Sequence, residues 1–482
     1  MRDYPFNPWE KWPEQGMAII SPSLRMDYQH LRNAVLRVES SLGDQGVEQG
    51  ALVQLELPDP AAWIATLALL RMGVATMGMG NPEQTLLPDY ILGPKRVDLD
   101  LVANRLVFDP AWLRQEAALD HEGNIATELP ADDQLLRIIL TSGTSGGAKA
   151  VGTTFGDMKR RTAFQQSYWS EFEHSLDLMG LSSTAGFYTA LVSFMNGRPY
   201  YSPRPVVKGS LASVSGFPIQ LISGSPIQIK ELLMGAKAAN LSFPSLKLIR
   251  ISGAASPDAV MESIEQQFPG VEVEILYGST EGGGVTRKVH APGESTMNVG
   301  KPLSGVELEI VNSDDSLVPV CKEGRIRYRT PGLIPGYWNQ ESHTAANFKD
   351  GYFYPGDLGY LDEDGNLNLI GRESEHVNLG GEKVNLQDYD RASLRVEGLE
   401  EAAAFVLQDE TGLNVIGLAF IGEVGNGKQL LERMRAKFGP QSPQVFFQVA
   451  EMPRNANGKT DRKKLAEAFR ESQGNKKARP AL

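Results

Sequence analysis

Residues 141–149 read TSGTSGGAK, and they follow directly on the apolar run LLRIIL at residues 135–140. A short, continuous apolar run that ends at a cluster of turn residues predicts a buried strand. The three glycines that come next let the backbone turn tightly and present its N–H groups to a ligand. Four hydroxyl groups add hydrogen-bond donors, and Lys149 adds a positive charge. The stretch therefore predicts a phosphate-binding loop at the end of a strand.

Two other motif readings compete for this loop. It is not a Walker A loop, because Ala148-Lys149-Ala150 stands where Gly-Lys-Ser/Thr is required. Residues 143–147 also match G-x-S-x-G, so a serine hydrolase with Ser145 as nucleophile is an alternative. That motif needs a helix directly after the serine, and GGAKAVGTT is a poor helix start. We therefore favour the phosphate-binding loop over the hydrolase and over a loop without any ligand.

The composition indicates a globular protein of several domains. At about 150 residues per domain, 482 residues predict two to four domains. The net charge of −12 argues against a general nucleic-acid binder. The one cysteine, Cys321, excludes an internal disulfide and a cysteine metal cluster. No signal peptide or membrane helix is expected, so we expect a cytoplasmic protein.

The charge is unevenly distributed along the chain. From Lys428 to Leu482 there are 13 Lys and Arg but only 5 Asp and Glu, a balance of +8. This basic segment is either a solvated helix with a loose tail or a surface that meets phosphates or an acidic partner.

Alternating apolar runs and helical stretches predict an α/β sheet with covering helices. Strands are expected at 246–251 and 271–276, with a helix at 257–268 between them. After about residue 300, short strands with tight turns predict a small β subdomain. A last segment again alternates helix and strand, and the polar residues 371–375 predict the main domain boundary.

Three further motifs follow the loop in order. They are YGSTE at 277–281, YPGDLG at 354–359 with Gly371-Arg372 after it, and PRNANGKTDRK at 453–463. Together with TSGTSGGAKAVG they resemble the signatures of the adenylate-forming (ANL) superfamily, which includes acyl- and aryl-CoA synthetases, luciferases and adenylation domains. SGAA at 252–255 and GKPLSGV at 300–306 extend the resemblance, which covers roughly residues 28–466.

The resemblance implies an α/β fold with a large N-terminal domain and a smaller, mobile α+β C-terminal domain. The N-terminal adenylation core would span residues 1–371 and combine α/β sheets with a small β-barrel. Residues 372–375 would form the hinge, and residues 376–482 the C-terminal lid domain.

The resemblance also implies a role for each motif. Tyr277 would stack on adenine, Asp357 would hold the ribose beside Arg372, and Thr280 with Glu281 would lie next to the reacting phosphate. Mg²⁺ would be held by Thr144 and Glu281, and the catalytic residues would be Lys459, Glu281 and Thr280. The residues expected to bind ATP are Thr141, Ser142, Gly143, Thr144, Ser145, Gly146, Gly147, Lys149, Gly253, Ala254, Ala255, Tyr277, Gly278, Ser279, Thr280, Asp357, Arg372 and Lys459.

The implied reaction has two steps. A carboxylate attacks the α-phosphorus of ATP and releases pyrophosphate, and Lys459 stabilises the charge of the transition state. The acyl group of the adenylate then passes to a thiol. Because no signature surrounds Cys321, we expect the phosphopantetheine thiol of CoA or of a separate acyl carrier protein.

Several positions depart from the family pattern. Ser374 stands where a hinge Asp or Lys is usual, Lys383 replaces a loop arginine, and Ala148 replaces a proline. Thr184 stands where amino-acid-activating members carry an Asp, and an ammonium buried without a carboxylate is costly.

We therefore expect an aryl or modest acyl acid as substrate, in a pocket lined by residues 182–188, 221–226 and 252–255. The expected substrate contacts are Thr184, Phe187, Gly224, Ser252, Gly253 and Tyr277. A nucleotide-binding homologue without turnover is a further alternative.

Overall fold

The computed structural model describes residues 7, 9–78, 86–94, 104–113, 129–142, 148–203, 208–379, 382–394, 396, 398–408, 413–422, 426–454 and 460–477. The chain divides into two compact units, each taken by itself below. The first unit comprises Met1–Lys322, Ile326–Pro355 and Leu361–Asn368, and the second comprises Glu323–Arg325, Gly356–Tyr360 and Leu369–Leu482. The last segment of the second unit begins near the predicted hinge, and the hinge itself stays a prediction.

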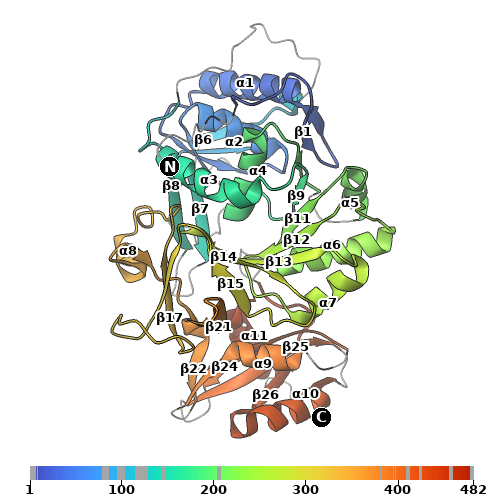
Figure 1. The fold of residues 1–482 in the computed structure, drawn as a ribbon, viewed down its shortest axis with the longest axis vertical. Coiled ribbons are helices and arrows are strands. Elements are labelled where there is room, and N and C mark those ends of the chain that lie inside the picture. The colour runs from blue at the N-terminus through green and yellow to red at the C-terminus, as the bar shows by residue number, and fades with distance from the viewer. Residues whose placement is uncertain are drawn as a thin grey trace. The chain divides into compact units, whose positions relative to one another are not determined.

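The first unit contains a sheet that ends in the hairpin around residues 143–147 (Figure 1). Its strands, in spatial order, are β6 (Asn104–Val107), β5 (Tyr90–Gly93), β3 (Leu52–Leu55), β4 (Ala75–Met77), β7 (Leu135–Ser142) and β8 (Ala148–Thr154). All neighbours are parallel except β7 and β8, which are antiparallel. The predicted strand at 135–140 is therefore confirmed as the first strand of this hairpin.

Two helices cover that sheet with apolar side chains. Helix α2 (Ala61–Arg71) is buried along its whole length, which explains its almost uniformly apolar sequence. Helix α1 (Tyr28–Asp44) is amphipathic and buries one face, from Tyr28 to Leu42. Their side chains form one hydrophobic core with Trp63 and Phe187.

The second sheet of the first unit carries the predicted motifs SGAA, YGSTE and GKPLSGV. It includes, in spatial order, β15 (Asn298–Pro302), β14 (Gly283–His290), β13 (Glu272–Ser279), β12 (Leu248–Ser252), β11 (Leu221–Gly224), β9 (Ser175–Asp177), β10 (Tyr200–Tyr201), β1 (Met17–Ile20) and β2 (Arg25–Asp27). Strands β9, β11, β12 and β13 are parallel. The predicted strands near 246–251 and 271–276 are confirmed, each within a few residues.

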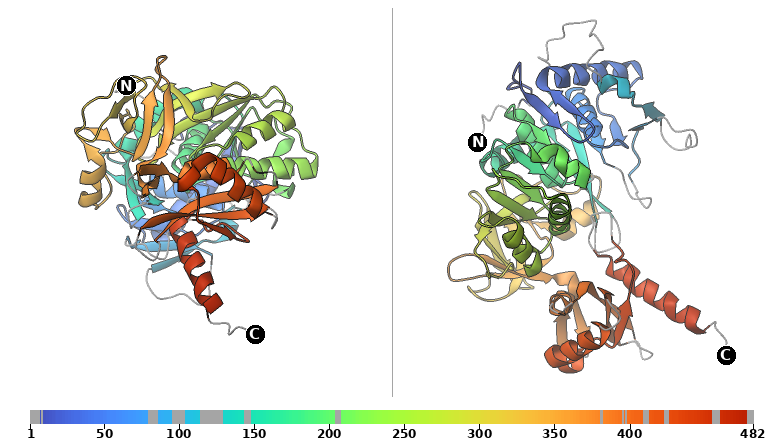
Figure 2. Two further views of the ribbon diagram at one scale, coloured as in Figure 1. Left: turned by 90° about the horizontal axis from the view of Figure 1, so that it is seen from below. Right: turned by 90° about the vertical axis from the view of Figure 1, so that its right-hand side faces the viewer.

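Helices complete the first unit around this sheet. They are α3 (Phe155–Trp169), α4 (Thr184–Met195), α5 (Lys208–Ser215), α6 (Pro226–Ala239), α7 (Asp258–Gln267) and α8 (Glu341–Asn347). Figure 2 shows α5, α6 and α7 together at one side of the sheet. Short strands β16 (Glu307–Val311), β17 (Gly324–Arg329), β18 (Phe348–Lys349) and β19 (Tyr352–Phe353) follow, as the sequence predicts for the small β subdomain.

The second unit is built around three strands, with apolar side chains on both faces. These strands are β24 (Leu399–Gln408), β25 (Asn414–Gly422) and β26 (Val445–Gln448). Helices α9 (Leu386–Ser393) and α10 (Asn426–Phe438) pack in one core, and α11 (Arg462–Lys477) packs in another. The hairpin of β22 (His376–Leu379) and β23 (Glu382–Asn385) precedes them. The predicted alternation of helix and strand is confirmed.

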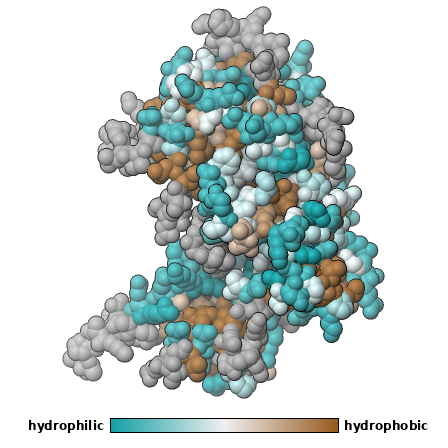
Figure 3. All heavy atoms as spheres, turned by 90° about the vertical axis from the view of Figure 1, so that its left-hand side faces the viewer, coloured by the Kyte–Doolittle hydropathy of each residue, from teal (hydrophilic) through white to brown (hydrophobic). Residues whose placement is uncertain are grey.

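The surface carries apolar side chains in separate places. The face in Figure 3 is largely hydrophilic, with apolar patches set apart by polar residues. In the part of the chain that the structure describes, no helix is both long and apolar enough to cross a membrane.

Candidate active site

The phosphate-loop motif lies at the tip of the β7–β8 hairpin. Thr141 pairs with Lys149 and Ser142 with Ala148, so the two ends of the motif are held side by side. The loop residues Gly143, Thr144, Ser145, Gly146 and Gly147 lie outside the described residues. A strand, β8, begins at Ala148, where the strand–turn–helix of a hydrolase nucleophile would require a helix.

The side chain of Lys149 is fixed by the β subdomain. Its Nζ donates to Oδ1 of Asn347, at the end of α8, over 3.0 Å. The same Nζ lies 5.2 Å from the ring centroid of Tyr337, within the range of a cation–π contact.

Tyr337 also contacts the predicted metal-binding carboxylate. Its hydroxyl donates to Oε1 of Glu281 over 2.8 Å, and Glu281 is 7% exposed. Lys149 and Glu281 come from motifs far apart in the sequence, and one tyrosine ring joins them. Tyr337 could not be predicted from the sequence, because a single tyrosine in the segment PGYW carries no chemical signal.

A buried arginine fixes the loop that carries Glu281. Arg161 of α3 is fully buried, and its Nε and one terminal nitrogen donate to the carbonyls of Gly332 and Thr280, each over 2.8 Å. The other terminal nitrogen donates to the carbonyl of Glu281. Three main-chain carbonyls thus converge on one guanidinium, which orients residues 280–281. Nothing in the sequence around Arg161 marks this role.

The residues expected at the adenine site lie at the carboxyl ends of β12 and β13. Residues 253–255 directly follow β12 and are exposed, whereas Ser252 is 8% exposed. Tyr277, Gly278 and Ser279 form the end of the adjacent, parallel strand β13. Neighbouring strand ends of this kind are where open α/β sheets bind ligands.

The loop before α4 is held by a buried carboxylate. Asp177, at the end of β9, accepts from the backbone N–H of Gly180 over 2.8 Å and from that of Met179 over 3.3 Å. Ser183 then caps α4 by accepting from the N–H of Gly186. These contacts fix the position of Thr184, the first residue of the helix.

Two of the expected substrate contacts lie in packed surroundings. Phe187 is 1% exposed and stacks on Trp63, with 5.5 Å between the ring centroids. The guanidinium of Arg137 lies 4.7 Å from the same ring, so core packing occupies Phe187. Burial lowers the pKa of Arg137 to about 10. Gly224 is buried beside Leu178, which leaves no open space for a side chain there.

The ribose motif forms an ion pair within the second unit. Nε of Arg372 lies 2.7 Å from Oδ1 of Asp357, so the two residues predicted to act at the ribose are brought together. The N–H of Glu373 also donates to the carbonyl of Gly356.

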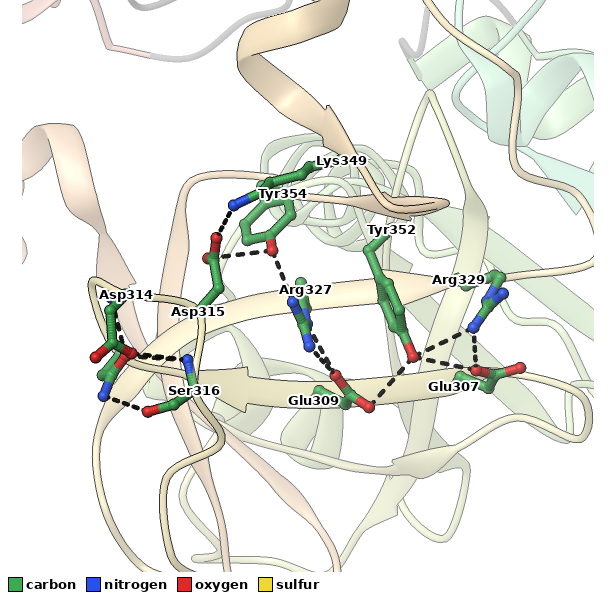
Figure 4. Close-up of polar contacts among 11 residues, drawn as sticks. Glu307, Glu309, Asp314, Asp315, Ser316, Arg327, Arg329, Lys349, Tyr352 and Tyr354 are labelled. Carbon is green, nitrogen blue, oxygen red and sulfur yellow. Dashed lines mark hydrogen bonds and ion pairs between the residues drawn. The ribbon is translucent and has the colours of Figure 1, made fainter.

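A polar network within the first unit holds Tyr354, the first residue of the segment YPGDLG. Tyr354 accepts from Arg327 and donates to Asp315, and Arg327 also donates to Glu309 (Figure 4). The network anchors the chain three residues before Asp357.

Lys459 lies outside the described residues, and so do residues 455–458. The base of its loop is closed, because Arg454 pairs with Thr460 and the N–H of Asp461 donates to the carbonyl of Pro453. Arg462 donates to Asp390 over 2.6 Å and lies 3.5 Å from Glu375. Burial raises the pKa of the Asp390 carboxyl, and Arg462 opposes this rise.

The donor set around Glu281 fits a magnesium ion better than a transition metal. Among the described residues, no group of three or more His, Cys, Asp or Glu is placed to hold a metal. Mg²⁺ commonly binds one or two carboxylates together with phosphate oxygens and water. Glu281 would supply the carboxylate and ATP would supply the phosphates.

The sequence matches a known family and its relatives. Residues 91–338 match the family described as AMP-binding enzyme. The chain is 25% identical to the fatty acid–[acyl-carrier-protein] ligase MmaC of Mycobacterium marinum, over 93% of each chain. It is 26% identical to 2-succinylbenzoate–CoA ligase of Geobacillus, over 94% of each. It is also 25% identical to tyrocidine synthase 3 of Brevibacillus parabrevis, of which it spans only 7%, and it spans 44% of tyrocidine synthase 1.

Solved structures share the fold. ATP-bound MatB from Rhodopseudomonas palustris superposes with a TM-score of 0.80 at 20% identity, covering 96% of this chain and 98% of that one. The o-succinylbenzoate CoA synthetase of Bacillus subtilis with its acyl-adenylate gives 0.79 at 22% identity, covering 94% and 95%. At these identities the likeness establishes the fold alone.

Proposed function

The chain belongs to the AMP-binding enzyme family, within the adenylate-forming superfamily, and from this premise we propose that it is an AMP-forming acid–thiol ligase. It would join a carboxylic acid to ATP, release pyrophosphate, and pass the acyl group to a phosphopantetheine thiol. The observation that carries the proposal is the contact of Tyr337 with both Lys149 and Glu281. A phosphate-loop cation and a metal-binding carboxylate are thereby held around one ring.

The adenylation step needs a site that lowers the repulsion between two anions. A carboxylate oxygen of the acid forms a bond to the α-phosphorus, and the bond from that phosphorus to the bridging oxygen breaks. Pyrophosphate leaves with the electron pair. Lys149 would hold the phosphates as a fixed positive charge, and Lys459 would stabilise the charge that develops at the α-phosphate. Mg²⁺, when bound, supplies further charge neutralisation on the pyrophosphate.

The residues proposed to hold the adenosine belong to three of the motifs. Residues 253–255 and Tyr277 would line the adenine, since they lie at two adjacent strand ends. Asp357 would accept hydrogen bonds from the ribose hydroxyls, with Arg372 orienting the carboxylate over 2.7 Å. Thr280 and Glu281 would keep their places because Arg161 holds both carbonyls.

We propose that the substrate is an aryl or modest acyl carboxylic acid that carries no charge besides its carboxylate. Thr184 offers a hydroxyl where a substrate ammonium would need a carboxylate, and the N-terminus of α4 also disfavours a cation. Isotope exchange between pyrophosphate and ATP, run across aryl, fatty and amino acids, tests the proposal. Turnover with aryl or short acyl acids supports it, and turnover only with α-amino acids contradicts it.

The acceptor is proposed to be either CoA or a separate carrier protein. Relatives of both kinds cover nearly the whole chain, one described as an acyl-carrier-protein ligase and one as a CoA ligase. The basic segment from Lys428 onward suits a polyanionic acceptor of either kind. Incubation with ATP, acid and either CoA or a phosphopantetheinylated carrier, followed by mass spectrometry of the thioester, separates the two.

The two other functions have less support. A serine hydrolase would need a helix after Ser145, and the chain continues instead into strand β8. A binding protein without turnover would give no pyrophosphate exchange with any acid.

A further inference from the structure

Three buried side-chain oxygens near the proposed site have unused hydrogen-bonding capacity. Oε1 of Gln165 and Oγ1 of Thr184 have no hydrogen-bond partner among the described residues, and the hydroxyl of Tyr188 has only the Arg161 guanidinium beside it, so that its proton is free to be donated. The three residues are 3%, 8% and 1% exposed. Because buried polar atoms in proteins are nearly always paired, such a group indicates a missing ligand or water.

The three residues come from two helices that pack together. Thr184 and Tyr188 are one turn apart on α4, so they share a face of that helix. Gln165 is one turn after Arg161 on α3, and the Arg161 guanidinium lies 5.7 Å from the ring centroid of Tyr188. Contacts between α3 and α4 bring these faces together, as their neighbouring positions in Figure 1 show.

The same group adjoins the loop of Glu281. Gly283, two residues after Glu281, lies so close to the Gln165 amide that a side chain at residue 283 would collide with it. Arg161 donates to the carbonyl of Glu281 and also faces Tyr188. These oxygens therefore lie beside the loop where the acid is proposed to react.

The chemistry of the three oxygens selects one kind of group. The hydroxyls of Thr184 and Tyr188 can donate, and Oε1 of Gln165 can only accept. Burial raises the pKa of Tyr188 to about 12, so its hydroxyl keeps its proton. A hydroxyl group on the ligand satisfies this set, because it accepts from one side chain and donates to another. The Arg161 guanidinium beside Tyr188 disfavours an ammonium at the same place.

We infer that the acid substrate carries a hydroxyl group, which Thr184, Tyr188 and Gln165 bind. This inference rests on the proposed function and narrows its substrate class to hydroxylated acids. The side chains would determine specificity and would not take part in the chemical step.

Matched pairs of acids test the inference. Pyrophosphate exchange is measured for aryl and short acyl acids that differ by one hydroxyl group, such as 4-hydroxybenzoate and benzoate, at several ring and chain positions. The wild-type protein should prefer at least one hydroxylated member by about tenfold in kcat/KM, the effect of one or two hydrogen bonds. Tyr188→Phe and Thr184→Val should each lower severalfold the preference for the hydroxylated acid, measured as the ratio of its kcat/KM to that of the acid without the hydroxyl group.

Tyr200→Phe is the matched control. Tyr200 is also a fully buried tyrosine, but it packs on Trp63 in the core. This change should leave the preference for the hydroxylated acid intact.

The outcomes of the exchange measurements distinguish a failure of the proposed function from a failure of the hydroxyl inference. If no acid supports exchange, the proposed function fails. If acids are activated but every hydroxylated member and its partner react equally well, only the hydroxyl inference is overturned, and the oxygens bind ordered water. The wild-type comparison decides this even if a variant fails to fold.

Discussion

Tyr337 is the central residue of the proposed ATP site, because Lys149 and Glu281 both contact it. We predict that Tyr337→Phe lowers the rate of pyrophosphate exchange by about ten- to a hundredfold. The ring and its contact with Lys149 remain, and a hydrogen bond to a carboxylate is lost, which contributes about 1.5–3 kcal/mol. The measurement is kcat at saturating ATP and Mg²⁺.

The control for this prediction is Tyr352→Phe. Tyr352 bonds to Glu307 and Glu309 in the network of Figure 4, away from Lys149 and Glu281. It should leave kcat unchanged. Equal losses in both variants would show that Tyr337 has no special part in the site.

His290 gives a prediction at the same scale for stability. Its side chain is buried at the end of β14, and burial, together with Lys288, lowers the pKa of the imidazole below its ordinary value. The folded state therefore binds this proton less readily than the unfolded state does. The stabilisation is complete above the unfolded pKa of about 6.5 and is lost as the pH falls below it, at up to about 1.4 kcal/mol per pH unit.

We expect His290→Phe to reduce the loss of stability between pH 7.5 and pH 5.5. Urea unfolding at the two pH values measures it, and His343→Gln, at a partly exposed position, serves as the control. An unchanged pH dependence in His290→Phe would contradict the prediction.

At the scale of elements, the chain around the motifs was predictable and the supporting contacts were not. The apolar run LLRIIL and the turn residues after it predicted the strand β7, because burial and turn chemistry are local properties. The helix at 258–267 and the strands of the second unit followed from periodicity in the same way.

The contacts that hold the motifs depend on chain segments far apart. Arg161 reaches residue 332, and Tyr337 reaches Glu281, over separations that no local pattern encodes. Phe187 shows the same dependence on distant segments. We expect it in the substrate pocket, and its ring stacks on Trp63 of a distant helix, a contact that no local pattern encodes.

An ion pair joins two helices of the second unit. Arg462 of α11 bonds to Asp390 of α9 and to the carbonyl of Ala404 in β24. We predict that Arg462→Met destabilises the second unit by about 3 kcal/mol, because it leaves a mostly buried carboxylate without its cation. The double variant Arg462→Met/Asp390→Leu should recover most of this loss, since both charges are removed. Chemical unfolding measures both. No recovery in the double variant would contradict an origin in the unpaired charge.

At the scale of the whole molecule, we propose that the two half-reactions depend on different parts of the chain. Lys459 belongs to the second unit, and its proposed role is confined to adenylation. We predict that Lys459→Ala lowers pyrophosphate exchange by at least a hundredfold, and that transfer from a supplied acyl-adenylate to the thiol stays within a fewfold of wild type. An equal loss in both half-reactions would contradict this division.

The uneven charge gives a second consequence at this scale. The +8 balance from Lys428 onward includes exposed residues of α10 and α11, such as Lys428, Arg435 and Lys463. If this surface guides a polyanionic acceptor, the KM for the acceptor should rise with salt, because exposed charges are screened. Steady-state kinetics at increasing NaCl concentrations measure the KM for the acceptor, and the KM for the acid substrate serves as the reference. If the KM for the acceptor does not change with salt, the basic residues are only solvated and do not guide the acceptor.

The most direct test of the central claim is exchange of labelled pyrophosphate into ATP by the wild-type protein. We predict that exchange requires a carboxylic acid and Mg²⁺ and that it proceeds without any thiol. Exchange without an added acid, or none with any acid across aryl, short acyl and amino acids, would contradict it.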